Sequence, residues 1–270
     1  KNFKEITLLG QNVDSYLWYG GGLKKDLAKA SEIQKASSIG FAKLLEMCAV
    51  TQPKMRIRFS TSNPQDMSLD VIKVMSKYEN ICNYIHLPVQ SGSDTILKAM
   101  NRQHTREEYL NLITNIKKLI PDCTISHDMI VGFPNETEHD HNETISLMNE
   151  VTFLFGYMFK YSERPGTLAE RKLEDNVEEH IKKRRLQEIV DLQQEHSLKR
   201  TKEFLNKKVE VLIDKESKKS DKHWAGRTEH NKVVVFPKEN YKIGDFVNVM
   251  TKQCTSATLI GKAIEHSKNN

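Results

Sequence analysis

Short apolar runs alternate with amphipathic segments through most of the chain. Runs with strand character occupy residues 5–9, 56–60, 84–89, 125–131 and 154–162. Between them, apolar residues recur at the helical spacing of three or four positions, over residues 39–50, 68–78, 93–100, 105–119 and 136–150. Strands that alternate with helices predict an α/β fold with a parallel sheet or barrel, whose ligands lie at the carboxyl ends of the strands.

N-cap residues mark the start of three of these helices. Ser68, Ser93 and Thr105 each stand directly before a periodic segment, and a side-chain oxygen at that position can accept a hydrogen bond from the first helical turn. Thr105 and Glu108 also have the spacing of a capping box. We therefore expect helices to begin at these three positions.

The pattern changes near residue 177. Residues 177–205 form one long, highly charged helical segment, which we interpret as a connector. Short β-rich runs about ten residues apart follow it, separated by Lys, Gly, Asn and Pro, and this texture is typical of a small antiparallel β-barrel. We predict two domains, an α/β body with its connector helix over residues 1–200 and a β-barrel over residues 201–266.

The composition indicates a soluble globular protein whose charge is unevenly distributed. Hydrophobic residues make up 38% of the 270 residues and charged ones 29%, no apolar run has the length of a membrane span, and the N-terminus does not resemble a secretory signal, so we expect a cytoplasmic protein without a membrane partner. Residues 201–270 hold 14 basic and 9 acidic side chains, whereas the preceding residues hold 27 of each. A basic terminal domain suggests a polyanionic binding partner such as RNA, although a charged surface that only contacts solvent would give the same count of basic and acidic side chains. The basic residues nominated for this surface are Lys207, Lys208, Lys218, Lys219 and Arg227.

Polar residues follow four of the predicted strands. They are Gln11 and Asn12, then Ser60 with Thr61 and Ser62, then Gln90 with Ser91 and Ser93, and then Asp128 before a Gly-Phe-Pro turn. Turn formation alone explains any single case, but the carboxyl ends of parallel strands converge, so together they predict one polar pocket. Asp128 could accept hydrogen bonds from a ribose or an ammonium group, and Arg102 could hold a carboxylate, which favours a zwitterionic ligand that carries a ribose.

Neither the cysteines nor the histidines have the spacing of a metal site. Cys48, Cys82, Cys123 and Cys254 lie at least 34 residues apart, and each is most simply a small buried side chain. His86, His104 and His127 flank the strand ends without a second ligand nearby, so we interpret them as ordinary hydrogen-bonded histidines. Trp224 could stack on a base, but an aromatic residue in a small barrel is more often part of its core.

Seven segments in order resemble the MiaB-type methylthiotransferases, which are radical S-adenosylmethionine (SAM) enzymes that modify tRNA. They are LLGQNVDSY, RIRFSTSNP, HLPVQSGSD, MNRQHTREEY, DMIVGFPNET, FKYSERPGT and GRTEHNKVVVF, and the resemblance runs from Glu5 to Ile264. It implies a partial parallel (βα) barrel of the radical SAM type followed by a TRAM domain that binds RNA. Both agree with the pattern of the chain.

The resemblance also implies an activity and a set of ligands. The family transfers a methylthio group to C2 of the adenosine that follows the anticodon, usually one that already carries an N6-isopentenyl group. One SAM donates its methyl group to sulfur, and a second is cleaved to a 5'-deoxyadenosyl radical that abstracts the C2 hydrogen. Gln90 and Asp128 should contact the SAM ribose and Arg102 its carboxylate, with Gln11, Asn12, Ser60 and Ser91 as further SAM contacts and the tRNA anticodon stem-loop as partner.

The chain departs from the family in its cysteines. The family holds one [4Fe-4S] cluster in a C-x-x-x-C-x-x-C loop after the first barrel strand, and a second in an N-terminal domain, yet neither cysteine set is present here. We therefore expect the chain to be the C-terminal portion of a longer protein, without metal ligands, catalytic residues or turnover of its own. Three alternatives remain, namely a relative that modifies threonylcarbamoyl-adenosine in tRNA, one that modifies a ribosomal protein, and a non-catalytic RNA-binding fragment.

Overall fold

Two short parallel sheets form the body of the computed structural model, which describes residues 3–22 and 24–268. In the first sheet, β1 (Glu5–Leu9) pairs with β4 (Arg56–Ser60), and in the second, β5 (Tyr84–His86), β6 (Thr124–Val131) and β7 (Phe155–Lys160) lie in that order. A parallel bridge between Ile57 and Ile81 connects the two sheets. All five predicted strands form, although the third covers only three residues.

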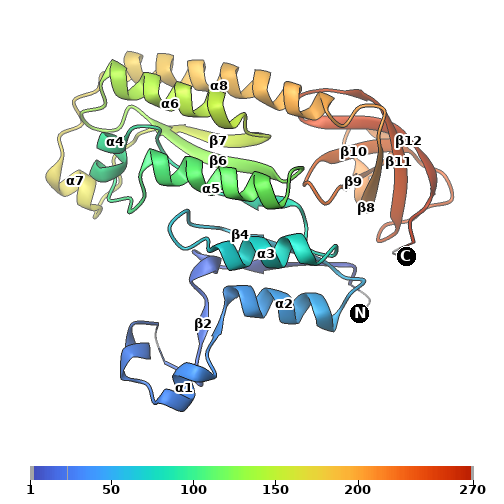
Figure 1. Cartoon of the computed structure of the whole chain (residues 1–270). Helices are drawn as coiled ribbons and strands as arrows, with labels where there is room; N and C mark the ends of the chain where they lie inside the picture. Colours follow the sequence, from blue (N-terminus) through green and yellow to red (C-terminus); the bar gives the residue numbers. More distant parts are fainter. Residues whose placement is uncertain (1–2, 23, 269–270) are drawn as a thin grey trace.

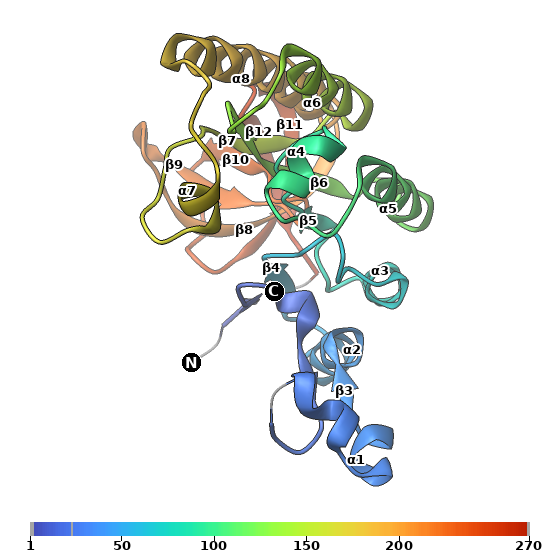
Figure 2. The ribbon, with the colours of Figure 1, turned by 90° about the vertical axis from the view of Figure 1, so that its left-hand side faces the viewer.

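Helices cover one face of these strands, as the arc of α3, α5, α6 and α8 in Figure 2 shows. The helices that follow the strands are α2 (Phe41–Thr51), α3 (Leu69–Lys77), α4 (Asp94–Ala99), α5 (Arg106–Leu119) and α6 (Glu138–Val151). Ser68, Ser93 and Thr105 accept hydrogen bonds from the first turns of their helices, and the capping box at Thr105 is complete. The predicted caps are therefore confirmed.

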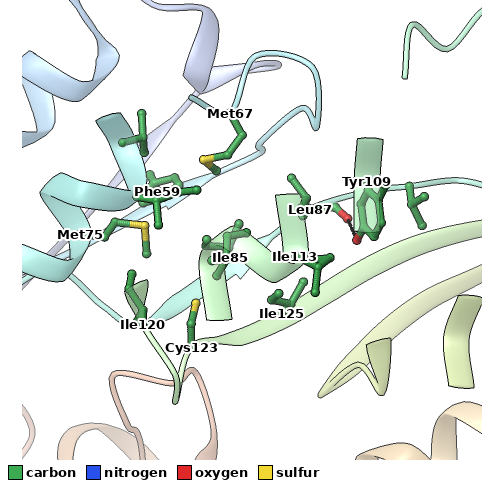
Figure 3. Packing of buried hydrophobic residues seen from close by; sticks show 14 of the residues in the cluster. Phe59, Met67, Met75, Ile85, Leu87, Tyr109, Ile113, Ile120, Cys123 and Ile125 are labelled. Atoms are coloured by element: carbon green, nitrogen blue, oxygen red, sulfur yellow. Dashed lines mark hydrogen bonds between the residues drawn. The ribbon is translucent and has the colours of Figure 1, made fainter. Parts of the chain in front are cut away.

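Alternate residues of each strand point into the core beneath the helices. Figure 3 shows Phe59, Ile85 and Ile125 packed there. In the same core, the fully buried Tyr109 donates a hydrogen bond from Oη to the carbonyl oxygen of Leu87 at 3.1 Å, which fixes the segment that leads from β5 toward Gln90. The remaining residues of each strand face the concave side of a half-open barrel.

An arm that the hydrophobic pattern did not predict extends away from the body between β1 and α2 (Figure 1). Its two short strands pair in antiparallel fashion, and short helices lie between them. The elements of the arm are η1 (Val13–Ser15), β2 (Leu17–Trp18), η2 (Lys24–Lys29), α1 (Glu32–Ala36) and β3 (Ile39–Gly40).

A long helix leads from the body to a closed five-stranded barrel (Figure 1). After the short α7 (Leu168–Lys172), α8 (Glu179–Lys202) packs along β7 and ends at the barrel. The barrel has its own apolar core and the strand order β10-β12-β11-β8-β9, with one parallel pair, β10 and β12, among antiparallel ones. Its strands are β8 (Lys208–Ser217), β9 (Ser220–Arg227), β10 (Val233–Pro237), β11 (Phe246–Cys254) and β12 (Thr258–His266).

Two buried arginines of β4 attach this barrel to the body. Arg56 Nη1 donates to the carbonyl oxygen of Arg227 at 2.8 Å, and Arg58 donates to the carbonyl oxygens of Thr228 at 2.6 Å and Glu229 at 3.1 Å. Charge-assisted hydrogen bonds to three consecutive carbonyl groups are strong and directional. The loop after β9 is therefore held against the concave side of the half-barrel.

Candidate functional site

Three of the predicted site residues line one cavity at the carboxyl ends of β5 and β6. The cavity has a volume of about 710 Å³ and includes Gln90, Arg102 and Asp128 in its wall. Phe133, Phe159 and Tyr161 complete much of the apolar part of that wall, and we had not predicted them. In the segment FGYMFK every second residue is aromatic, and in a strand this alternation indicates that Phe159 lies on the same face as Phe155 and Tyr157, which is the concave side.

Gln90 is held in a conformation that few residues other than glycine adopt. Its φ angle is 76°, in the left-handed region. Two backbone hydrogen bonds to β6 pin it there, one from its N–H to Asp128 O at 2.9 Å and one from Ile130 N–H to its carbonyl oxygen at 2.9 Å. Backbone strain that the surrounding structure enforces in this way is typical of binding sites.

The Asp128 carboxylate has an oxygen without a hydrogen-bond donor. Oδ1 is buried and accepts no hydrogen bond within the described part of the chain. Nε2 of His86 lies 3.5 Å from Oδ1, while the other nitrogen of that ring hydrogen-bonds Ser126 Oγ at 2.8 Å. A buried acceptor without a donor costs free energy unless a ligand supplies one.

Arg102 brings a positive charge to the same cavity. The end of α4 places it there, because Asn101 adopts a φ of 57° and Arg102 N–H donates to Leu97 O at 2.9 Å, which closes the helix. Burial lowers the pKa of Arg102, and the charge of Asp128 opposes that effect. Across residues 3–22 and 24–268 the guanidinium group has neither a hydrogen-bond nor an ion-pair partner, so it is available to an anionic ligand.

The other four predicted SAM contacts do not line this cavity. Ser91 is fully buried, where its Oγ accepts a hydrogen bond from Ser93 N–H and lies 3.3 Å from Thr144 Oγ1 on α6. Asn12 donates to Asp66 at 2.5 Å, Ser60 lies beside Thr61, and Gln11 is exposed after β1. Only the ends of β5 and β6, together with the segment after α4, bring predicted residues together.

The histidines lie apart from one another. His127 is buried on the face of β6 opposite to Asp128. There its Nε2 hydrogen-bonds Gln193 Oε1 at 2.8 Å, and burial lowers the pKa of His127 to about 4. His104 is also buried, which lowers its pKa, whereas His86 faces Asp128. Within the described residues, no group of three His, Cys, Asp or Glu side chains has the geometry of a metal site.

The cysteines do not fit an iron–sulfur cluster. Burial raises the pKa of Cys82 and of Cys123 to about 12 and also raises the pKa of Cys48, whereas cluster ligation requires thiolates. All four are free cysteines, and Cys254 belongs to the barrel. No step of a reaction can be assigned to a cluster held by these residues.

The five basic residues predicted to bind RNA do not form one patch. Lys207 and Lys208 stand at the start of β8, and Arg227 lies at the end of β9, where it donates to Asn231 Oδ1 at 3.0 Å. Lys218 and Lys219 form the turn at the far end of β8, about 30 Å along a strand of ten residues. Trp224 packs against the barrel core, with Lys238 Nζ 4.4 Å from its ring centroid.

Comparison with known proteins identifies both parts of the chain. The model of the radical SAM superfamily matches residues 2–148, and that of the TRAM domain matches residues 202–264. The chain is 70% identical over its full length to the tRNA-2-methylthio-N(6)-dimethylallyladenosine synthase of Christiangramia forsetii, and 64% identical to that of Flavobacterium psychrophilum. It spans 56% of the length of each of these relatives.

A more distant likeness is to a solved structure, the coproporphyrinogen III oxidase of Escherichia coli, with a TM-score of 0.48 and 14% identity over 75% of this chain and 52% of that one. The resemblance to the MiaB-type methylthiotransferases is confirmed by the two curated relatives, and the predicted α/β body followed by a barrel is confirmed by the structure. No described helix is both long enough and apolar enough to cross a membrane. The chain belongs to the radical SAM superfamily and carries a TRAM domain after its α/β body.

Proposed function

We propose that the cavity lined by Gln90, Arg102 and Asp128 binds SAM. The buried Asp128 oxygen without a donor suits the ribose hydroxyls or the ammonium group, the unpaired Arg102 suits the carboxylate, and the Gln90 amide suits the ribose. A cavity of about 710 Å³ is large enough for a ligand of this size. When bound, SAM supplies a methyl group and the radical chemistry of the superfamily, while these residues bind and orient it.

We also propose that the whole protein is a tRNA-2-methylthio-N(6)-isopentenyladenosine synthase. The observation that carries it is the 70% identity to the curated relative over the full chain, in a protein that combines a radical SAM body with a TRAM domain. The chain described here lacks the cluster cysteines expected of the family, so it has no turnover without the remainder of the protein. That N-terminal portion, with its clusters, is its expected partner, and the cytoplasm its expected location.

The barrel is the RNA-binding domain. We place the domain boundary near residue 201, because the α/β body and the barrel have separate apolar cores joined by α8. Lys207, Lys208 and Arg227 lie at the end of the barrel that contacts the body, which is where an anticodon stem-loop must approach for its adenosine to reach the SAM cavity. Phosphate contacts made by such residues weaken as the salt concentration rises.

Mass spectrometry of tRNA from a strain that lacks the gene tests this function. The expected result is loss of the 2-methylthio group with accumulation of N6-isopentenyladenosine, and its restoration by the complete gene. Normal levels of 2-methylthio-N6-isopentenyladenosine in the deletion strain would contradict the proposal. Loss of a methylthio group from threonylcarbamoyl-adenosine, or from a ribosomal protein, would instead identify the alternative substrates.

A further inference from the structure

A row of aromatic side chains on β7 faces the concave side of the half-barrel. Phe155, Tyr157 and Phe159 alternate with Gly156 and Met158, and Met158 packs into the core beneath the helices. Tyr157 is 54% exposed and Phe159 is 51% exposed, and both belong to β7, the edge strand of the sheet β5-β6-β7. Tyr157 contacts Phe155 and His86 edge to face, with ring centroids 5.9 Å and 6.1 Å away. Two large aromatic rings therefore lie exposed on the concave side of this strand.

This row connects two cavities. Phe159 lines the cavity that holds Gln90, Arg102 and Asp128. Tyr157 and Phe155 line a second cavity of about 600 Å³, whose opposite wall comes from the barrel and includes Arg227, Asn231 and Lys232. Successive residues on one face of a strand are about 7 Å apart, so the two exposed rings bridge the distance between the cavities.

The polar groups at the two ends differ in their chemistry. The first cavity offers the Asp128 oxygen that accepts no hydrogen bond within the described residues, together with the Arg102 guanidinium group. The barrel wall of the second cavity carries the cation of Arg227, whereas the Lys232 ammonium group is buried and donates to Thr201 Oγ1 and to the carbonyl oxygen of Ser256, and no described Asp or Glu lines that cavity. A planar apolar surface between a small-molecule site and a basic surface fits a nucleotide, whose base stacks on aromatic rings while its phosphates contact cations.

We propose that Tyr157 is the stacking platform for the target base of the RNA substrate, with Phe159 as the apolar wall between that base and the SAM cavity. The proposal rests on the proposed function and adds the residues that position the substrate. An enzyme that modifies a base at an atom inside the stack must first take the base out of the stack. The row on β7 gives such a base a surface that leads from the RNA-binding barrel to the SAM cavity.

Binding of two RNA stem-loops to the protein expressed from its complete gene tests this role. One RNA carries the target adenosine, and the other is abasic at that position. Stacking on an aromatic side chain typically strengthens binding about tenfold or more, so the parent protein should bind the adenosine RNA at least tenfold more tightly than the abasic RNA. Tyr157→Leu should bind the two RNAs equally, and Tyr157→Phe should discriminate as the parent does.

Trp18→Leu is the matched control, because Trp18 is an exposed aromatic residue on β2, in the arm and outside both cavities. It should keep the full discrimination, and all variants should keep the SAM affinity of the parent. If Tyr157→Leu does not fold, Tyr157→Val provides the same readout with a residue suited to a strand.

Each result of the binding experiment supports or contradicts the role of Tyr157 as a stacking platform. Full discrimination by Tyr157→Leu would overturn the role of Tyr157 and show that the base binds elsewhere or that an upstream segment covers this face. Loss of discrimination in Tyr157→Phe would overturn stacking in favour of the hydroxyl group. A parent protein that binds neither RNA nor SAM would overturn the proposed function, whereas a parent that binds both without discriminating would overturn this inference alone.

Discussion

The three polar residues of the segment Gln90 to Ser93 have opposite roles. The Gln90 side chain lines the cavity, whereas Ser91 and Ser93 turn toward α6, where Ser93 Oγ donates to Asp140 Oδ1 at 2.6 Å. Hydrogen bonding satisfies the serines inside the protein and leaves the cavity residues for a ligand. The segment is therefore half binding surface and half packing contact.

Replacing Gln90 by alanine should weaken SAM binding by up to about tenfold, because one neutral hydrogen bond to the ligand is lost. Ser91→Ala is the matched control one residue away, and it should leave SAM affinity unchanged. Calorimetric titration of SAM into the protein expressed from its complete gene measures both variants, and urea unfolding verifies that they are folded. Equal weakening by the two substitutions would show that the segment acts through structure alone.

His127 should make stability depend on pH. Its pKa of about 4 in the folded protein lies below the value of about 6.5 in the unfolded chain, so the unfolded chain binds the extra proton as the pH falls from about 6.5 to 4. The contribution of His127 to the free energy of unfolding is therefore present above pH 6.5. About 2 kcal/mol of this contribution is lost between pH 7 and pH 5.

Urea unfolding at pH 7 and pH 5 measures this effect as a difference between the parent protein and His127→Gln. The difference cancels the opposite effect of Asp14, whose pKa burial raises to about 7. The parent should lose about 2 kcal/mol more than the variant over this range. An identical pH dependence in both proteins would show that His127 is not buried in its neutral form.

At the scale of elements, local signals in the sequence were sufficient for the strands and helices of the body. Ser68, Ser93 and Thr105 cap their helices as predicted, because a cap depends on residues only three positions apart. The arm of residues 10–40 was not predicted, since its elements are too short to show a period. The partners of Ser91 and Ser93 lie 53 and 47 residues away, so no local pattern could separate these serines from Gln90.

Ser93→Ala should destabilise the protein more than Ser68→Ala. Both substitutions remove an N-cap, which costs about 1 kcal/mol, but only the first also removes the donor to Oδ1 of the buried Asp140 carboxylate, whose Oδ2 keeps its donors from Thr137, for a total of about 3 kcal/mol. Urea unfolding of the two variants compares them directly. Equal losses would show that the bond between Ser93 and Asp140 contributes nothing to stability.

At the scale of the whole molecule, the relation between the body and the barrel could not be predicted. The run RIRFS was expected to be a strand, yet nothing in it indicates that Arg56 and Arg58 bind the barrel loop more than 160 residues later. Their side chains are only 6% and 8% exposed, so the attachment is a buried one. It holds the TRAM barrel next to the concave face that carries Tyr157.

Arg58→Met should loosen this attachment. The carbonyl oxygens of Thr228 and Glu229 would lose the guanidinium group that donates to them, and the carboxylate of Glu5 would lose its ion pair with Arg58, at a cost of about 3 kcal/mol. Limited proteolysis should then release the barrel faster than in the parent, whereas the exposed Arg171→Met should behave as the parent does. Unchanged proteolysis would show that α8 alone holds the two domains together.

The central claim is that the cavity of Gln90, Arg102 and Asp128 binds SAM, and titration of SAM into Asp128→Asn tests it most directly. Loss of charge-assisted hydrogen bonds should weaken binding about 10- to 100-fold in the protein expressed from its complete gene. Asp70→Asn, which changes an exposed carboxylate on α3, should bind SAM as the parent does. A SAM affinity of Asp128→Asn within about twofold of the parent value would contradict the claim, because the buried Asp128 oxygen that accepts no hydrogen bond within the described residues would then have no role in binding.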